Sequence, residues 1–323
     1  MSLPNTVVIG PGAIGGFFAA CLTEAGWPVT VLARGAAARE HFAEPLTIEQ
    51  DGIERHVSLA VTDDPSRSAP FDLALVCVKS MDTDNAANQL RGQLAEDGVV
   101  LSMQNGVENT DRIAAALPGA TVAGVAMYVG IERESPLRII RRSSRGPGGD
   151  ARDRLVGGPP GRIGDVLTAV GNASGVRVEL TDDPVASLWT KLIGNVCLNT
   201  VTALGRSRVG DVFASPDAIS LMLSLGHEVE AVAAAAGVRL PTAAAATYVE
   251  DAGRRLPHSG GSSTLFDLEA GRPLEHDALV GAVVRIGASL DVDTPVSRTC
   301  LTILNLLDTR NRSARSPAEG AGT

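Results

Sequence analysis

Short apolar runs alternate with longer helical patterns through the first half of the chain. These runs are typical of buried strands, because a strand covered on both faces carries hydrophobic residues at every position. They lie at 5–9, 28–33, 72–78 and 98–102. Helical patterns occupy 13–25 and 82–96, and a hairpin is predicted over 46–59 around Asp51-Gly52. Strands that alternate with helices in this way indicate a parallel sheet with helices on both faces.

The pattern changes after about residue 181. Long Ala- and Leu-rich segments follow, with helix-start signals such as Asp183-Pro184 and Ser215-Pro216. The predicted helices lie at 184–204, 215–236, 242–254, 275–290 and 296–308. We therefore expect an all-helical C-terminal domain at 182–310 after an α/β domain at 1–181, and a disordered polar tail at 311–323.

The segment Gly10-Pro11-Gly12-Ala13-Ile14-Gly15 follows the first predicted strand and opens the first predicted helix. In that position a Gly-x-Gly-x-x-Gly motif is typical of a Rossmann-type, doubly wound parallel sheet that binds a dinucleotide. The glycines permit a tight turn and let N–H groups at the positive end of the helix approach the pyrophosphate. Gly10, Gly12, Ala13, Ile14 and Gly15 are the predicted contacts. The alternative is a glycine-rich turn without a ligand.

The end of the second predicted strand bears on the choice of cofactor. It has the sequence Leu32-Ala33-Arg34-Gly35, without the Asp or Glu that accepts hydrogen bonds from the ribose of NAD. A guanidinium such as that of Arg34 can pair with a 2′-phosphate. NADP(H) is therefore the predicted cofactor. The alternative is that Arg34 is a solvated loop cation.

Composition and charge exclude other classes of protein. The chain has 323 residues and a net charge of −9, which argues against broad nucleic-acid binding. Its cysteines stand far apart and its histidines lack metal-ligand spacing, so we expect buried reduced thiols and no metal. No apolar run approaches the roughly 18 residues that span a bilayer. We expect a cytoplasmic protein without a membrane partner.

One predicted helix carries polar side chains within an apolar segment. Lys191, Asn195 and Asn199 are four residues apart, so at about 100° per residue they fall within roughly 80° of one another. Trp189 and Leu192 are among the apolar neighbours that predict burial of this helix. The polar face is therefore predicted to line a site. The alternative is a solvated lysine beside two exposed amides.

Several stretches, in order, resemble the ketopantoate reductase family (2-dehydropantoate 2-reductase). They are VVIGPGAIGGFFAACLTEAG, LVCVKSMDT, LSMQNGVEN, LWTKLIGNVCLNTVTAL and SSTLFDLEAGRPLEHD. The resemblance covers most of 5–305. It implies a Rossmann domain followed by a helical domain, and NADPH-dependent reduction of the 2-keto acid 2-dehydropantoate to pantoate, a step toward coenzyme A.

The resemblance also implies roles for individual residues. Lys191 matches the family's proton donor, and Asn195 and Asn199 match asparagines that contact the substrate. Lys79 and Asn105 each follow a buried strand, at the sheet edge where ligands bind, and match positions that contact cofactor and substrate. The remaining matches are Ser263, a substrate-binding serine, and Glu275, an active-site glutamate that could orient Lys191.

Two features depart from the family. Residues 138–162 hold seven arginines and predict an irregular segment, either a basic surface loop or a locally altered reading frame. Val280 stands where the family usually has Asn before the glycine. Other readings therefore stay open: a reductase of another 2-keto acid, an opine-type or 3-hydroxyacid dehydrogenase, or a catalytically degraded nucleotide-binding sensor. The assembly is also open, with a homodimer as one candidate.

Overall fold

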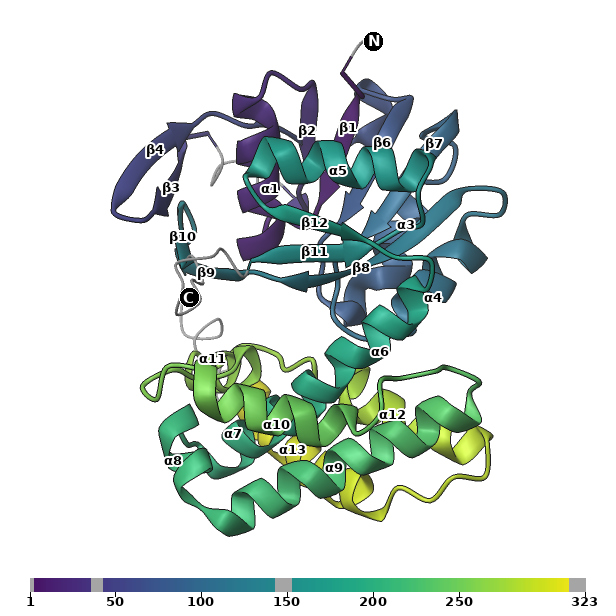
Figure 1. Ribbon diagram of the computed structural model, residues 1–323. Coiled ribbons are helices and arrows are strands. Elements are labelled where there is room, and N and C mark those ends of the chain that lie inside the picture. The colour runs from purple at the N-terminus through teal and green to yellow at the C-terminus, as the bar shows by residue number, and fades with distance from the viewer. Residues whose placement is uncertain (1–2, 36–42, 143–152, 314–323) are drawn as a thin grey trace. The chain divides into compact units, whose positions relative to one another are not determined.

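The computed structural model describes residues 3–35, 43–142 and 153–313, and it divides into two compact units (Figure 1). Unit 1 comprises Met1–Gln104 and Glu108–Ser187, and unit 2 comprises Asn105–Val107 and Leu188–Thr323. The short turn Asn105–Val107 belongs with unit 2 because Val107 packs against the hydrophobic core of that unit. Each unit is described by itself.

An eight-stranded sheet forms the frame of unit 1, in the order β12-β11-β8-β7-β6-β1-β2-β5. The strands are β1 (Thr6–Ile9), β2 (Val29–Leu32), β5 (Ala60–Thr62), β6 (Phe71–Val76), β7 (Leu94–Ser102), β8 (Thr121–Tyr128), β11 (Arg154–Gly157) and β12 (Arg177–Leu180). Neighbouring strands are parallel except β11 and β8. From β1 the chain adds β2 and β5 on one side, and it then returns to pair β6 with the other side of β1. The ends of β1 and β6 therefore form a topological switch point, the usual place for a ligand in such sheets.

Helices cover both faces of this sheet, which confirms the predicted fold class. Alternate strand residues point to opposite faces: Val8 and Leu75 pack in one core, Val7 and Val76 in the other. The first core also contains side chains of α1 (Ala13–Glu24) and α5 (Arg162–Ser174), and the second those of α3 (Thr83–Gln89) and α4 (Asn109–Ala116). Burial on both faces is the physical reason for the continuous apolar runs.

A second, four-stranded sheet has the order β4-β3-β10-β9. Its strands are β3 (Leu46–Gln50), β4 (Ile53–Val57), β9 (Gly130–Ser135) and β10 (Arg138–Arg142). The predicted hairpin is confirmed, and its turn residues Asp51 and Gly52 have φ values of 52° and 80°, as the tight hairpin turn with two left-handed residues requires. The helix predicted over 82–96 was too long, because Gly92 (φ 69°) reverses the chain and β7 begins at Leu94.

The expectation of an irregular basic loop over 138–162 is wrong for the parts that the structure describes. Residues 143–152 lie outside those parts, but β10 precedes them and β11 follows them. Arg141 is buried and donates to the carbonyl oxygens of Ser174 (3.0 Å) and Gly175 (3.1 Å), with the Asp153 carboxylate at 3.4 Å. The arginine-rich pattern suggested a loop because the carboxylate and carbonyl groups that pair with Arg141 come close to it only in the folded protein.

Unit 2 is helical. Its elements are the end of α6 (Pro184–Gly194), a π-helical turn (Asn195–Asn199), α7 (Thr200–Gly205), α8 (Val209–Ala214), α9 (Pro216–Ala235), α10 (Ala244–Arg255), α11 (Ser263–Glu269), α12 (Val280–Ser289) and α13 (Pro295–Ser313). The predicted start of α9 is confirmed, since the Ser215 hydroxyl accepts from the Ala218 N–H at 3.2 Å. The expected disordered tail is wrong for residues 311–313, because α13 continues to Ser313. The rest of that prediction, 314–323, lies outside the described residues.

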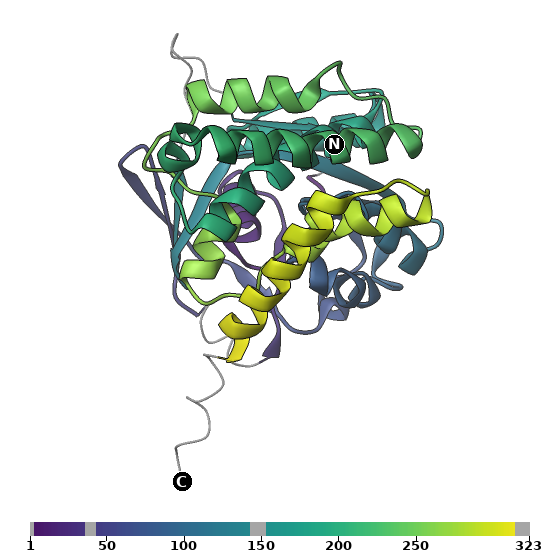
Figure 2. The same cartoon turned by 90° about the horizontal axis from the view of Figure 1, so that it is seen from below.

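α9 runs beside α10 (Figure 2) and also packs against α12 and α13. By length and composition it could span a membrane, with a mean hydropathy of 1.3 over its most apolar window. Two of its acidic side chains nevertheless accept hydrogen bonds from the first turns of other helices in unit 2. Glu228 accepts from the N–H groups of Val296 (2.8 Å) and Ser297 (2.7 Å), and Glu230 accepts from that of Ala245 (2.9 Å). These contacts cap α13 and α10, as befits the core helix of a bundle.

Candidate functional site

The glycine turn joins β1 to α1 at the switch point of the sheet. Gly10 has φ of 92°, and a Cβ there would lie 2.7 Å from the Val78 nitrogen; a Cβ on Gly15 would lie 2.2 Å from the Gly10 oxygen. Neither position therefore tolerates a side chain. Gly12 differs, because its φ of −77° is ordinary and no atom lies within 4 Å of its would-be Cβ. Nothing in the described protein requires glycine at position 12, whereas a ligand close to the backbone would.

The start of α1 is suited to hold that ligand. Gly12 is its N-cap residue, and the Gly16 N–H donates to the Gly12 oxygen at 2.9 Å. The N–H groups of the intervening residues, Ala13, Ile14 and Gly15, therefore precede the first intrahelical bond and have no acceptor within the helix. No acidic residue stands in the first turn. Open space, N–H groups and the positive end of a helix dipole together fit a pyrophosphate.

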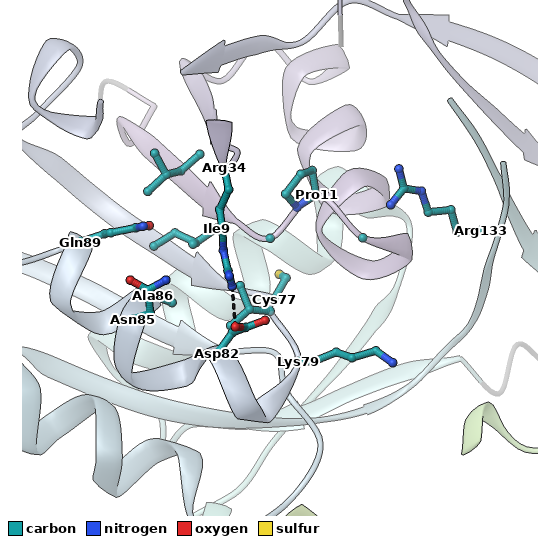
Figure 3. Close-up of a pocket in the computed structure, with 14 residues that line it drawn as sticks. Ile9, Pro11, Arg34, Cys77, Lys79, Asp82, Asn85, Ala86, Gln89 and Arg133 are labelled. Carbon is teal, nitrogen blue, oxygen red and sulfur yellow. Dashed lines mark ion pairs between the residues drawn. The ribbon is translucent and has the colours of Figure 1, made fainter. Parts of the chain in front are cut away.

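A pocket of about 250 Å³ opens beside this turn, lined from the ends of β1, β2 and β6 and from α3 (Figure 3). Among the described residues, three cations line it: Arg34 after β2, Lys79 after β6, and Arg133 on β9. The sequence had singled out Arg34 and Lys79, and the structure brings them to the same pocket. Arg133 was missed, because it stands between Glu132 and Glu134 on β9 and only the second sheet carries it to the pocket.

Arg34 already has a partner in this pocket. Its guanidinium lies 2.6 Å from the carboxylate of Asp82, and the two side chains are 59% and 36% exposed. Figure 3 shows them pointing toward one another, with Lys79 and Arg133 to one side. Arg34 lies in a loop and is largely exposed, as the alternative of a solvated loop cation expected, but it also lines the pocket. Its partner Asp82 is a second pocket residue that the sequence did not indicate.

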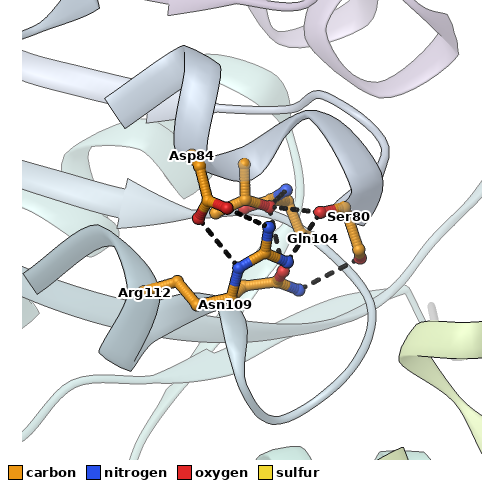
Figure 4. Close-up of polar contacts among 6 residues, drawn as sticks. Ser80, Asp84, Gln104, Asn109 and Arg112 are labelled. Carbon is orange, nitrogen blue, oxygen red and sulfur yellow. Dashed lines mark hydrogen bonds and ion pairs between the residues drawn. The ribbon is translucent and has the colours of Figure 1, made fainter. Parts of the chain in front are cut away.

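A buried polar network holds the loop after β6 (Figure 4). Gln104 donates from Nε2 to the Val78 carbonyl (3.0 Å) and to the Thr83 hydroxyl (2.7 Å). The Thr83 hydroxyl donates to the Ser80 carbonyl at 2.9 Å. Thr83 and Ser80 are almost fully buried. Lys79 lies between the anchored residues Val78 and Ser80, so its backbone position is set from both sides.

The other half of the network comes from α4. Asn109 donates from Nδ2 to the Ser80 hydroxyl at 3.2 Å, and Arg112 donates to the Ser80 carbonyl at 2.8 Å. Arg112 also pairs with Asp84 at 2.9 Å. Buried networks of this kind are stabilising when every member is satisfied, and they favour a single backbone arrangement. The network therefore positions the loop rather than binding a ligand itself.

In unit 2 the polar residues of the predicted helix sit around a π-helical turn. α6 ends at Gly194, and residues Asn195–Asn199 form the turn. The single-face argument assumed about 100° per residue throughout, and that angle does not apply from Asn195 onward, because a π turn closes i→i+5 bonds and takes up an extra residue. Gly194 faces Tyr248 so closely that a Cβ would lie 2.6 Å from Cε2. Turns of this type occur frequently at functional sites.

The π turn leaves its two asparagines in different situations. Asn199 is buried, and its Nδ2 lies 3.4 Å from the Ser263 hydroxyl, so two predicted substrate residues are brought together. Asn195 Nδ2 is buried without a hydrogen-bond partner among the described residues. A buried donor left without an acceptor costs roughly 1–3 kcal/mol. An oxygen atom brought within hydrogen-bond distance of Nδ2 would remove that cost.

Glu275, the last of the predicted site residues along the chain, is the N-cap residue of a 3₁₀ turn, His276–Ala278. Glu275 is half-buried. Val280, the second departure from the family pattern, is fully buried in a small cluster with Ala203 and Leu304. An amide at that position would need hydrogen-bond partners that this apolar cluster does not offer, so valine fits the packing here.

The comparisons with known proteins agree with this division. The family model described as ketopantoate reductase PanE/ApbA matches residues 6–147, and that described as its C terminal matches 184–308. The 2-dehydropantoate 2-reductase of Halobacterium salinarum is 31% identical over 94% of this chain and 98% of its own length. A PanE/ApbA family ketopantoate reductase from Ralstonia eutropha superposes with a TM-score of 0.83 at 33% identity, over 95% of this chain and 99% of the other.

The fold extends to a more distant enzyme. D-mandelate dehydrogenase, solved with NADH and anilino(oxo)acetate, has a TM-score of 0.84 at 18% identity, over 95% of this chain and 99% of the other. The first family match runs through β10, part of the segment that the sequence had set apart from the family. The two matches and the full-length relatives together show that the chain belongs to the ketopantoate reductase family of oxidoreductases.

Proposed function

We propose that the protein reduces 2-dehydropantoate to pantoate with NADPH, and that Lys191 is the general acid. The observation that supports this most directly is the unpartnered Asn195 amide, four residues after Lys191 at the start of the π turn. A nucleotide-binding sensor would gain nothing from a buried donor beside a lysine. A keto acid supplies an oxygen atom that can accept from Asn195 Nδ2 and one that the Lys191 ammonium can protonate.

The cofactor is assigned to unit 1. Gly12 and the first turn of α1 would hold the pyrophosphate, and Arg34 would pair with the 2′-phosphate, while Lys79 adds positive charge to the same pocket. When bound, the nicotinamide supplies the hydride that reduces the keto carbon. The fold alone does not select NADPH, since the related dehydrogenase holds NADH.

The proton donor is assigned to unit 2. As the carbonyl carbon is reduced, negative charge develops on its oxygen, and the Lys191 ammonium donates a proton from Nζ to give the hydroxyl product. Lys191 is left as a neutral amine and is recharged from solvent. Asn195 would donate to a substrate oxygen and Asn199, with Ser263, would hold the substrate. Glu275 would orient Lys191 or a substrate hydroxyl.

The experiment is a steady-state assay of NADPH and NADH oxidation at 340 nm with 2-dehydropantoate and with other branched 2-keto acids. Lys191→Ala is expected to lower kcat by about 10²-fold or more while coenzyme binding is retained, since only the proton donor is removed. Asn195→Ala should raise KM more than it lowers kcat. Val185→Ala, on an exposed position of the same helix, is the matched control and should behave as wild type.

The possible results separate the candidates. Turnover of another keto acid at a higher kcat/KM than 2-dehydropantoate would favour the paralogue. Binding of coenzyme without turnover of any 2-keto acid would favour the sensor. Full activity of Lys191→Ala would show that another group donates the proton.

A further inference from the structure

The pocket of unit 1 contains one acidic residue at the place where a phosphate is expected. Of the described residues that line it, Arg34, Lys79 and Arg133 are cationic and only Asp82 is acidic. Asp82 does not neutralise the pocket in general. It pairs with Arg34, the residue assigned to the 2′-phosphate, at 2.6 Å.

Asp82 is held in place by the fold. It ends the 3₁₀ turn Ser80–Asp82, and its N–H donates to the Lys79 carbonyl at 2.8 Å. The residues around it are anchored by the buried network, because Ser80 (2% exposed) and Thr83 (0%) both take part in it. The backbone at Asp82 therefore cannot withdraw without breaking buried hydrogen bonds. Only the side chain can turn away when a ligand arrives.

The two coenzymes meet this carboxylate differently. A 2′-phosphate carries about −1.5 to −2 charges near neutral pH, by analogy with phosphorylated side chains, so it must take Arg34 from Asp82 and then lie near a like charge. The 2′-hydroxyl of NADH is neutral and can donate a hydrogen bond to a carboxylate, as it does to the acidic residue of NAD sites. Arg34 favours one coenzyme and Asp82 the other.

We propose that Asp82 is a coenzyme-specificity residue, which competes with the 2′-phosphate for Arg34 and holds the preference for NADPH over NADH below what Arg34 alone would give. The inference rests on the proposed function only in taking this pocket as the site of a nicotinamide dinucleotide. It adds Asp82, in the loop after β6, as a residue that counteracts the preference of Arg34 for the 2′-phosphate.

The test uses the full chain and two adenosine fragments, adenosine 2′,5′-bisphosphate and adenosine 5′-monophosphate, whose binding is measured by calorimetry. Asp82→Asn is expected to lower the Kd of the bisphosphate by about 3- to 10-fold, because an exposed ion pair no longer has to be broken and a like charge is removed. The Kd of the monophosphate should change by less than about 2-fold, since this fragment lacks the 2′-phosphate. Raising the salt concentration should shrink the difference.

Matched variants isolate the effect. Asp111→Asn removes a charge from an exposed position of α4 that does not line the pocket, and should change neither fragment. Arg34→Gln should weaken the bisphosphate and leave the monophosphate nearly unchanged. Asp82→Ser serves as a second variant and should tighten the bisphosphate as Asp82→Asn does. Thermal unfolding of each variant verifies that it is folded.

Because no keto acid is present, the binding results are independent of the reaction. Unchanged or weaker bisphosphate binding in both folded Asp82 variants would overturn the role of Asp82 and leave the proposed reductase function standing. Failure of the wild type to bind either fragment would overturn both proposals. In the turnover assay, the ratio of kcat/KM for NADPH to that for NADH should rise in Asp82→Asn by the same factor as the fragment affinity.

Discussion

The buried pair of Arg141 and Asp153 offers a quantitative test of unit 1. The two side chains are only 4% and 3% exposed, and their closest charged atoms are 3.4 Å apart. Asp153→Ala removes the carboxylate and leaves a guanidinium enclosed by protein. Its remaining donors still reach the carbonyls of Ser174 and Gly175, at the end of α5.

The expected loss of stability follows from these contacts. Removing one partner of a buried ion pair destabilises a protein by about 3–5 kcal/mol. The two carbonyl contacts keep the guanidinium partly satisfied, so we expect the lower end, about 3 kcal/mol. For a domain of 150–250 residues, about 2–4 °C of Tm correspond to each kcal/mol, which predicts a fall of roughly 6–12 °C for unit 1.

The measurement is thermal unfolding followed by calorimetry and circular dichroism. Glu132→Gln is the control. It breaks the neighbouring pair with Arg142, whose side chains are 68% (Arg142) and 49% (Glu132) exposed, and should shift Tm by no more than about 2 °C. The double variant Arg141→Met/Asp153→Leu should lose less than the two single changes added together, because it leaves no unpaired charge.

A fall of less than about 2 °C in Asp153→Ala would refute this reasoning. It would mean that the pair is open to water and that Arg141 and Asp153 do not form the buried ion pair described above.

Two further predictions concern the glycine turn and the thiols. Gly12→Val should lower Tm less than Gly10→Ala does, since its Cβ meets open space, yet weaken NADPH binding by about 10²-fold or more in calorimetry because the side chain fills the pyrophosphate position. Gly10→Ala should lower Tm more, because a φ of 92° and contact with Val78 both oppose a side chain; the reverse pattern would contradict the assignment. Burial raises the pKa of Cys21 to about 11 and that of Cys197 to about 12, so at pH 8 both stay protonated and these two thiols should resist iodoacetamide in the folded protein. Labelling should become fast in denaturant, where thiol pKa values return to about 8.5; equally fast labelling of the folded protein would show that these thiols are accessible.

The parts of the fold that were predicted correctly are those with a local cause. A strand buried on both faces must be apolar at each position, and β1, β2 and β6 were found for that reason. The glycine turn was found because its spacing follows from the geometry of a strand, a turn and a helix start. The cap of α9 by Ser215 is likewise a contact between near neighbours in the chain.

The parts that were missed depend on partners far away in sequence. Arg141 was assigned to a surface loop because its acceptors Ser174 and Gly175 lie 33 and 34 residues further on. The π turn at Asn195–Asn199 has no signature in a single sequence, and its neighbour Gly194 meets Tyr248 from another helix. Arg133 and Asp82 were not candidates, because nothing local distinguishes them from other surface charges.

The sequence by itself determined the class of fold, the turn that is suited to a pyrophosphate, and the family whose motifs the chain carries, because each depends on residues adjacent in the chain or spaced by a helix or strand period. Tertiary structure alone decided the partner of Arg34 and the role of the arginines around β10. It also left Asn195 without an acceptor. The physical reason is the same throughout: local backbone geometry is encoded within a few residues, whereas burial and charge pairing depend on which distant segments pack together.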